Sequence, residues 1–261
     1  MNVLPWFFSL LVAIPVLGIP ATTLAMVYRG ARSNGASRSA ATWCIVLSAV
    51  GAALWGAMLW WVAASGAFTR ITVLVPIATT VSLLVALAWA RIPVVTASLH
   101  APGAASALIA PQTLRIAGVV FLLAMVLGRL PWVFALPAGI GDIAVGITAP
   151  FAIRRSARGA VVGAVWFNVL GLFDLVVALT LGALSGLRDA TQLIPTTPSS
   201  AELTMLPLVL VPTAAVPLAI ALHILDLAAL RRLAHRGRAG SGQGTGRLRP
   251  DASLGARSAL D

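Results

Sequence analysis

The stretch PWFFSLLVAIPVLGIPATTLAMVY, residues 5–28, contains no charged side chain. An α-helix rises about 1.5 Å per residue, so a run of this length can cross a hydrocarbon core about 30 Å thick. Arg29, Arg32 and Arg38 follow the run, where a cleavable signal peptide would carry a small-residue cleavage site. We therefore expect residues 5–28 to form a permanent membrane-spanning helix.

Similar apolar runs recur along the chain. Hydrophobic residues make up 59% of the 261 residues and charged residues only 10%, whereas a soluble domain carries about 25% charged residues. The sequence therefore predicts an all-α fold, a polytopic transmembrane helical bundle within residues 1–230. Seven spans are expected, at about 5–28, 41–65, 71–90, 114–130, 138–153, 160–186 and 204–230.

The distribution of arginine predicts the orientation. All 18 basic residues are arginines, and positive charge accumulates in cytoplasmic loops of membrane proteins. With the N-terminus outside and the C-terminus in the cytoplasm, 15 arginines, Arg115 among them, fall on the cytoplasmic side. Only Arg70, Arg129 and Arg188 fall outside. We expect a multi-pass protein of the plasma membrane in this orientation, with its arginines near anionic lipids at the cytoplasmic face.

Four of the segments between or beyond the predicted spans carry predictions of their own. Residues 91–113 are expected to form a semi-apolar cytoplasmic loop and residues 187–203 a polar external loop. Residues 130–139 contain Pro131 and Pro137, which leaves open a short interfacial loop or a re-entrant segment. Residues 231–261 are rich in glycine, serine and arginine, which predicts a disordered basic cytoplasmic tail.

Charged and amide residues within the predicted spans are confined to the last four. An ionisable group at the centre of a bilayer costs about 2.5–3.5 kcal/mol on insertion scales, so such residues are candidates for function. The first three spans have no charged residue. The candidate polar path, running from the outside inwards, comprises Arg129, Asp142, Asn168, Asp174, His223 and Asp226.

Each candidate also has a structural interpretation. Arg129 and Asp142 are expected near the outer ends of their helices, where they can form an ion pair, or Arg129 can extend to the headgroups. Asp174 has no basic residue in its own helix, so it either finds a partner elsewhere or stays protonated and hydrogen-bonds a neighbouring helix. His223 and Asp226 are three residues apart and therefore share a helical face.

A short internal similarity connects two of these helices. Residues 139–148, GIGDIAVGIT, and 171–180, GLFDLVVALT, both match G-x-x-D-[IL]-x-V-x-[IL]-T. The two helices should run in opposite directions, and inverted repeats are common in transporters. The earlier helices do not extend this similarity.

Several functional classes lack the residues they require. No lysine is available for a Schiff base, and the one cysteine, Cys44, cannot form an intramolecular disulfide. His223 is the only histidine expected within the membrane, so the sequence predicts no cofactor: a metal site and a bis-histidine haem lack ligands, and only haem with one weak axial ligand is left open. No nucleophile–base–metal set is visible, which argues against an enzyme, and no solvated basic face suggests nucleic-acid binding.

Two functions remain. The first is transport of a small solute, or proton-linked transport, along the polar path. The second is a non-catalytic sensor, scaffold or assembly subunit in which the same polar residues only fix helix packing. A water-accessible cavity that reaches Asp174 would favour transport, and dry, fully paired side chains would favour the second function. The solute and the oligomeric state are not indicated by the sequence.

Overall fold

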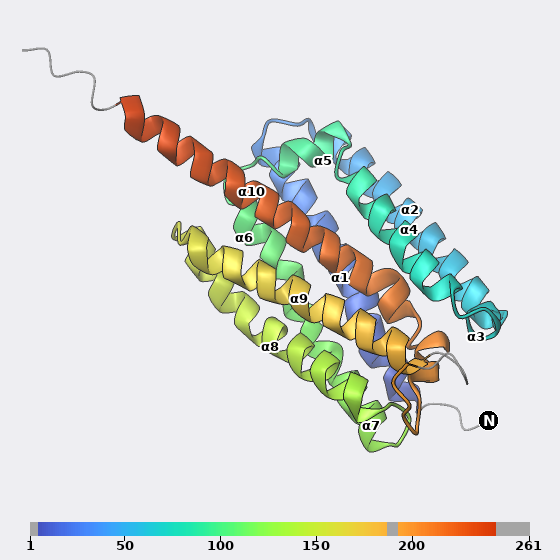
Figure 1. The fold of residues 1–261 in the computed structure, drawn as a ribbon. Helices are drawn as coiled ribbons and strands as arrows, with labels where there is room; N and C mark the ends of the chain where they lie inside the picture. Colours follow the sequence, from blue (N-terminus) through green and yellow to red (C-terminus); the bar gives the residue numbers. More distant parts are fainter. Residues whose placement is uncertain (1–4, 187–192, 244–261) are drawn as a thin grey trace, which may run out of the picture.

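The structure is a computed structural model that describes residues 5–186 and 193–243, with the side chains described up to Ala234. The described elements are helices (Figure 1). In chain order they are α1 (Trp6–Ser33), α2 (Arg38–Ala64), α3 (Ala67–Arg70), α4 (Leu74–Trp89), α5 (Pro93–Ser98), α6 (Ala104–Ile109), the 3₁₀ helix η1 (Ala110–Gly118), α7 (Val119–Val126), α8 (Trp132–Ala157), α9 (Val161–Gly186), the 3₁₀ helix η3 (Ser200–Thr204), the π-helical turn η4 (Val211–Ala215) and α10 (Val216–Gln243).

Six helical segments are long and apolar enough to cross a membrane: Trp6–Ser33, Arg38–Ala64, Ala104–Val126, Trp132–Ala157, Val161–Gly186 and Val211–Ala234. The third of them joins α6, η1 and α7, and the sixth joins η4 to most of α10. α4 is apolar but shorter, at 16 residues. This composition identifies a multi-pass membrane protein that lies in a lipid bilayer. The total of seven crossings, the orientation and the choice of membrane stay predictions.

The fourth predicted span begins earlier in the structure than the sequence suggested. The helical segment starts at Ala104 rather than near 114, because α6 and η1 extend through the region expected to be a loop. Pro111 lies at the start of η1, where its missing N–H costs no hydrogen bond. Arg115 therefore lies in the middle of this segment and not at its boundary, where the predicted span of 114–130 placed it.

The link between the fourth and fifth spans is an ordinary turn. Residues 127–131 connect α7 to α8, and Gly128 adopts a positive φ of 67° there. α8 begins at Trp132 and contains Pro137, so the stretch 132–139 is helical and no re-entrant segment forms. Pro131 immediately precedes the helix, where an extended residue is tolerated. At the other end of the chain, α10 stays helical to Gln243, within the segment expected to be a disordered tail; residues 244–261 lie outside the described residues.

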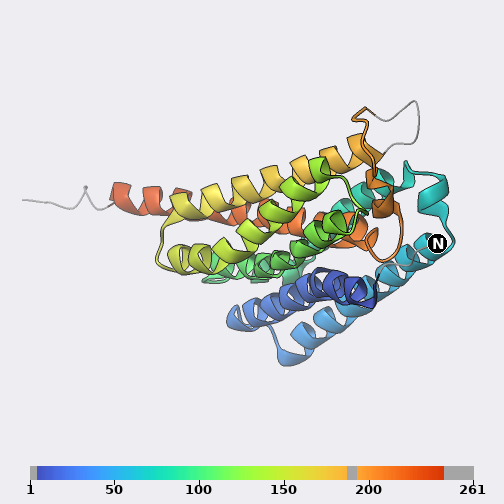
Figure 2. The ribbon, with the colours of Figure 1, turned by 90° about the horizontal axis from the view of Figure 1, so that it is seen from below.

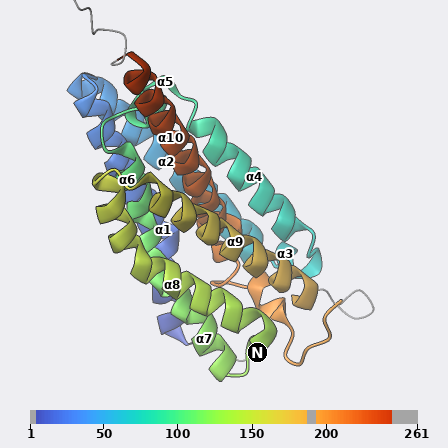
Figure 3. The same ribbon diagram turned by 60° about the vertical axis from the view of Figure 1, so that its left-hand side comes forward.

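The long helices lie side by side, roughly parallel or antiparallel to one common axis (Figures 1 and 3). α8 contacts η1 and α9, and α9 contacts α10, which also contacts α4. α1 contacts both η1 and α2, so it lies between the α8–α9 side and the α2–α4 side. In Figure 2, α2 lies at the edge of the bundle, next to α1.

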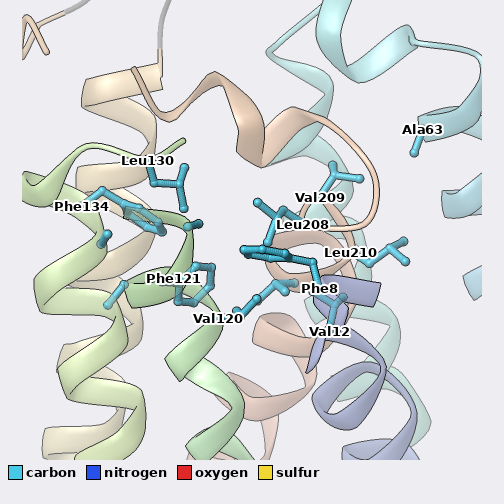
Figure 4. Close-up of a cluster of buried hydrophobic side chains, with 14 of the residues drawn as sticks. Phe8, Val12, Ala63, Val120, Phe121, Leu130, Phe134, Leu208, Val209 and Leu210 are labelled. Carbon is cyan, nitrogen blue, oxygen red and sulfur yellow. The ribbon is translucent and has the colours of Figure 1, made fainter. Parts of the chain in front are cut away.

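The hydrophobic core is divided into two clusters. One lies near the end of the bundle where α1 and α8 begin, and it joins Phe8, Phe121, Phe134 and Leu208 (Figure 4). The rings of Phe121 and Phe134 meet edge to face, with centroids 5.3 Å apart. The other cluster, with Ile19, Val145, Phe167 and Leu222 among its members, lies further along the bundle. The polar residues described below belong to the same helices as these clusters.

A proline-induced irregularity marks the start of α10. Pro217 has no N–H, so the carbonyl groups one turn before it lose a helical partner, and the N–H of Val216 bonds instead to the carbonyl of Val211. Two hydroxyl groups of α4 compensate. Thr79 Oγ1 donates to the Pro212 carbonyl at 2.8 Å, and Ser82 Oγ donates to the Thr213 carbonyl at 2.7 Å. α4 is thereby tied to the irregular turn of α10.

Candidate functional site: a buried arginine shared between helices

Arg115 occupies the middle of the segment Ala104–Val126, about 16 Å from either end at 1.5 Å per residue. Its side chain is only 3% exposed. A guanidinium group at this depth cannot reach water by extending along the helix, so its charge must be balanced by neighbouring protein groups.

Two carboxylates from two different helices balance that charge. Arg115 Nε donates to Asp142 Oδ1 of α8 at 2.7 Å. Arg115 Nη2 donates to Asp174 Oδ2 of α9, also as an ion pair. The planar guanidinium offers five N–H groups in a fixed fork, which suits simultaneous contacts in several directions. One arginine therefore connects three membrane-spanning segments.

Glycines make this close approach possible. A Cβ added at Gly118 would lie 2.3 Å from Cβ of Asp142, and one added at Gly141 would lie 1.6 Å from Oδ1 of Asp174. A Cβ at Gly171 would lie 2.5 Å from the ring of His223. Each of these polar side chains thus packs against a backbone position where only hydrogen fits. Small residues at helix contacts are typical of packing in membranes.

A second chain of hydrogen bonds leads from Arg115 to α10. Arg115 Nη1 lies 3.3 Å from His223 Nε2, and it also donates to the Gly171 carbonyl at 3.4 Å. His223 Nδ1 lies 2.8 Å from Asn168 Oδ1. Asn168 Nδ2 donates to Asp226 Oδ2 at 2.7 Å and to the Ala164 carbonyl at 2.8 Å. His223, Asn168 and Asp226 are at most 1% exposed.

The geometry of this chain determines the direction of each hydrogen bond. Both acceptors of Asn168 Nδ2 are oxygens, which fixes the orientation of the amide, so Asn168 Oδ1 faces His223 and can only accept. His223 Nδ1 must therefore carry the proton, and Nε2 accepts from Arg115. These bonds fit a neutral imidazole whose tautomer is set by its two partners.

The carboxyl groups of the cluster outnumber its cation. The cluster contains three carboxyl groups, Asp142, Asp174 and Asp226, but only one guanidinium. Asp142 and Asp174 contact that guanidinium, whereas Asp226 is paired with the neutral amide of Asn168. Among the described residues, Asp226 Oδ1 is a buried oxygen with no hydrogen-bond partner. If His223 is neutral, zero net charge requires two protons on the three carboxyl groups. Buried unpaired charge is costly, so the cluster is a natural place for proton binding.

Little open space adjoins the cluster. A cavity of about 20 Å³ lies beside Arg115 and Asp142, bounded by Pro15, Phe121 and Val211 among others. This volume can hold about one water molecule. Asp174 is not among the residues that line it, although its side chain and that of Asp142 are each 15% exposed. In the part of the chain that the structure describes, no group of three or more His, Cys, Asp or Glu residues could hold a metal ion.

Five of the six predicted path residues lie in this cluster, which we call the Arg115 cluster: Asp142, Asn168, Asp174, His223 and Asp226, together with Arg115. Arg129 does not belong to it. Arg129 Nη2 pairs with Glu202 Oε1 at 2.5 Å, near the end of the bundle. Of the two interpretations offered for Arg129, an ion pair with Asp142 does not fit the structure, because Asp142 pairs with Arg115 and lies ten residues inside α8, which begins at Trp132.

Arg115 is the functional candidate that the sequence interpretation missed. Pro111 and Gln112 interrupt the hydropathy of residues 104–114, which placed Arg115 at a predicted span boundary. The signal that could have revealed it is the internal similarity between 139–148 and 171–180. Its two aspartates, Asp142 and Asp174, bind the same guanidinium, so the matching positions of the repeated motif mark the two carboxylates that share Arg115.

A family model matches residues 72–231, a range that contains every residue of the Arg115 cluster, and its description is "Domain of unknown function (DUF8737)". No curated protein and no solved structure matches the chain. α1 and α2 precede the matched range, and the other long helices lie within it or begin in it. Since the match covers more than half of the 261 residues, the chain belongs to the DUF8737 family.

Proposed function

We propose that the protein carries out proton-linked transport of a small solute, with the Arg115 cluster as the proton-binding element. The observation that carries this proposal is the sharing of one buried guanidinium between Asp142 and Asp174 on separate helices. Arg115 makes both ion pairs at the same time, through different N–H groups. Protonation of Asp142 weakens the contact of Arg115 with α8, and protonation of Asp174 weakens the contact of Arg115 with α9. Such a change gives two discrete helix arrangements, which alternating access requires.

The excess of carboxyl groups supports the same proposal. With three carboxyl groups and one guanidinium, the number of bound protons can change while at least one ion pair stays in place. Asp226, with one unpartnered buried oxygen, offers a further position for a proton or a water molecule. His223 and Asn168 connect it to Arg115, so a change at either end alters the hydrogen bonding of the other.

The test uses purified protein in liposomes with an imposed pH gradient and a mixed library of small metabolites outside. Mass spectrometry of the vesicle contents identifies any solute that enters only when the gradient is present. We expect Asp174→Asn and His223→Ala to abolish this uptake. Glu202→Gln is the matched control, because Glu202 is a carboxylate outside the Arg115 cluster and pairs with Arg129. Uptake that is unchanged in both cluster variants would remove the main support for transport.

One observation favours a second function, in which the Arg115 cluster only fixes helix packing in a sensor, scaffold or assembly subunit. The adjoining cavity has a volume of about 20 Å³, and Asp174 does not line it. This second function predicts that Asp174→Asn and His223→Ala lower the thermal stability in detergent, while no gradient-dependent uptake is found for the wild type. Measuring stability and uptake on the same preparations separates the two functions.

A further inference from the structure

A large apolar cavity lies on the side of the bundle away from α8 and α9. Its volume is about 920 Å³, at the upper end of the range of about 300–1,000 Å³ that is typical of small-molecule sites. Residues of α1, α2, α4 and the region around η4 line it, and most of the lining side chains are aliphatic or aromatic. Those that matter below are Cys44, Gly51, Trp55, Gly56, Ser82 and Trp89.

α2 forms the outer wall of this cavity and is attached to the bundle mainly at its ends. Its buried residues are Ala41 near one end and Leu59 and Ala63 near the other. Its middle contains Gly51 and Gly56, and a Cβ added at either position would meet no atom within 4 Å. The middle of α2 therefore stands away from its neighbours and leaves space that the protein does not fill.

Two reciprocal hydrogen bonds hold α2 and α4 at this separation. Trp55 Nε1 of α2 donates to Ser82 Oγ of α4 at 2.9 Å, and Trp89 Nε1 of α4 donates to Ser48 Oγ of α2 at 2.8 Å. The serine precedes the tryptophan by seven residues in both helices, so the two antiparallel helices are joined at two levels. The indole rings span the gap as walls of the cavity.

The polar atoms of these walls already have partners. Ser48 Oγ donates to the Cys44 carbonyl at 2.7 Å, and Ser82 Oγ donates to the Thr213 carbonyl at 2.7 Å. Ordered water needs two to four polar partners, and this lining offers few. The space is not enclosed, since several of its lining side chains, Leu17 and Leu47 among them, are exposed at the outside of the helical bundle. The occupant must therefore be rich in hydrocarbon.

We propose that this cavity binds a hydrocarbon chain of a membrane lipid. Two of the helices that line the cavity, α1 and α2, are long and apolar enough to span the membrane, so the cavity between them lies at the depth of the acyl chains. A chain that enters beside α2 meets aliphatic and indole surfaces without displacing any of the four hydrogen bonds described above. The lipid would take the place of missing side chains and support α2 against α1 and α4. This proposal is independent of proton-linked transport.

The first test measures lipid that remains bound after purification in detergent. Lipids are extracted from monodisperse protein and quantified by mass spectrometry. We expect wild type to retain lipid in a fixed ratio to protein, and the double variant Gly51→Leu/Gly56→Leu to lose it, because the added side chains occupy the cavity. Leucine is a better helix former than glycine, so α2 itself tolerates both changes.

The matched control is Ala49→Leu, an exposed position of α2 that does not line the cavity. It should retain lipid as wild type does. Equal lipid content in wild type and the double variant would overturn the proposal, since that lipid would belong to the general protein surface. Absence of retained lipid in wild type, or retention of an apolar compound that is not a lipid, would overturn it as well.

Cys44 allows a second test that does not require leucine side chains to be introduced into the cavity. It is the one cysteine of the chain, it lines the cavity, and it is partly exposed. A small fluorophore on Cys44 is exposed to phospholipid with brominated acyl chains, and free lipid is then diluted into detergent. Quenching should persist at Cys44 and vanish in Cys44→Ala/Ala49→Cys labelled at position 49. Equal residual quenching at both positions would contradict the proposal.

Discussion

At the scale of single residues, Arg115 is the group on which the arrangement of the polar side chains depends. Breaking a buried ion pair by removal of one partner costs about 3–5 kcal/mol, because the remaining charge stays buried. Arg115→Met should therefore lower the free energy of unfolding by about this amount, measured by reversible unfolding in mixed micelles. Arg115→Met combined with Asp142→Asn and Asp174→Asn should recover most of the loss, since no uncompensated carboxylate remains.

Arg129→Met is the control for that experiment. Arg129 and Glu202 are 27% and 17% exposed, so their ion pair is partly solvated and we expect its loss to cost at most about 1 kcal/mol. If Arg115→Met cost no more than Arg129→Met, the two carboxylates around Arg115 would not depend on its charge.

Gly141 provides a second prediction at this scale. Alanine at this position would place Cβ 1.6 Å from Asp174 Oδ1, so the carboxylate would have to move away from Arg115. Gly141→Ala should destabilise the protein by about 1–3 kcal/mol through overpacking, although alanine is the better helix former. Gly163→Ala is the matched change in α9, where the nearest atom, Cδ of Arg155, is 3.9 Å away. It should be neutral or stabilising in the same unfolding measurement.

The sequence predicted the members of the Arg115 cluster better than their connections. Charged or amide side chains inside apolar runs are costly, and this argument alone selected Asp142, Asn168, Asp174 and the His223–Asp226 pair. It could not show that Asp142 turns towards Arg115 rather than Arg129. That choice depends on where the two helices begin and on how they pack. Hydropathy does not show the helix starts here, because it falls around Pro111 and Pro137 although the helical segments continue through both prolines.

At the scale of elements, the contact between α4 and the irregular start of α10 decides how the last helix is held. Thr79→Val leaves the partly buried Pro212 carbonyl without its hydroxyl donor, which should cost about 1 kcal/mol. In a Pro217→Ala background, Thr79→Val should lower the free energy of unfolding by less. Residue 217 then has an N–H, and the register of the turn, in which Val216 bonds to the carbonyl five residues earlier, directs that N–H to Pro212.

The four unfolding free energies of this double-mutant cycle give the coupling directly. Strictly additive costs would mean that the hydroxyl of Thr79 does not replace the hydrogen bond that Pro217 removes. Pro212 and Pro217 are visible in the sequence, but nothing there indicates that two hydroxyl groups of the third predicted span compensate for the hydrogen bond that Pro217 removes. Such compensation depends on which helix packs beside α10.

At the scale of the whole molecule, the number of membrane crossings depends on α4. Its 16 residues correspond to about 24 Å, less than the hydrocarbon thickness of about 30 Å, whereas the other six segments are long enough. With an external N-terminus, the arginine distribution nevertheless favours a crossing by α4. Without Arg115, the predicted orientation still places 14 arginines in the cytoplasm and three outside. If α4 did not cross, the loops after it would exchange sides, and an external N-terminus would leave five of these arginines in the cytoplasm and 12 outside, which reverses the expected bias.

Single cysteines on either side of α4 test this crossing in a Cys44→Ala background. Ser65 and His100 are exposed residues in the segments that precede and follow α4. A membrane-impermeant maleimide should label Ser65→Cys in intact cells and label His100→Cys only after permeabilisation, because seven crossings from an external N-terminus place these residues on opposite sides. Labelling of both positions in intact cells would mean that α4 turns back within the membrane. The chain would then cross six times, and the arginines that follow α4 would no longer mark the cytoplasmic face.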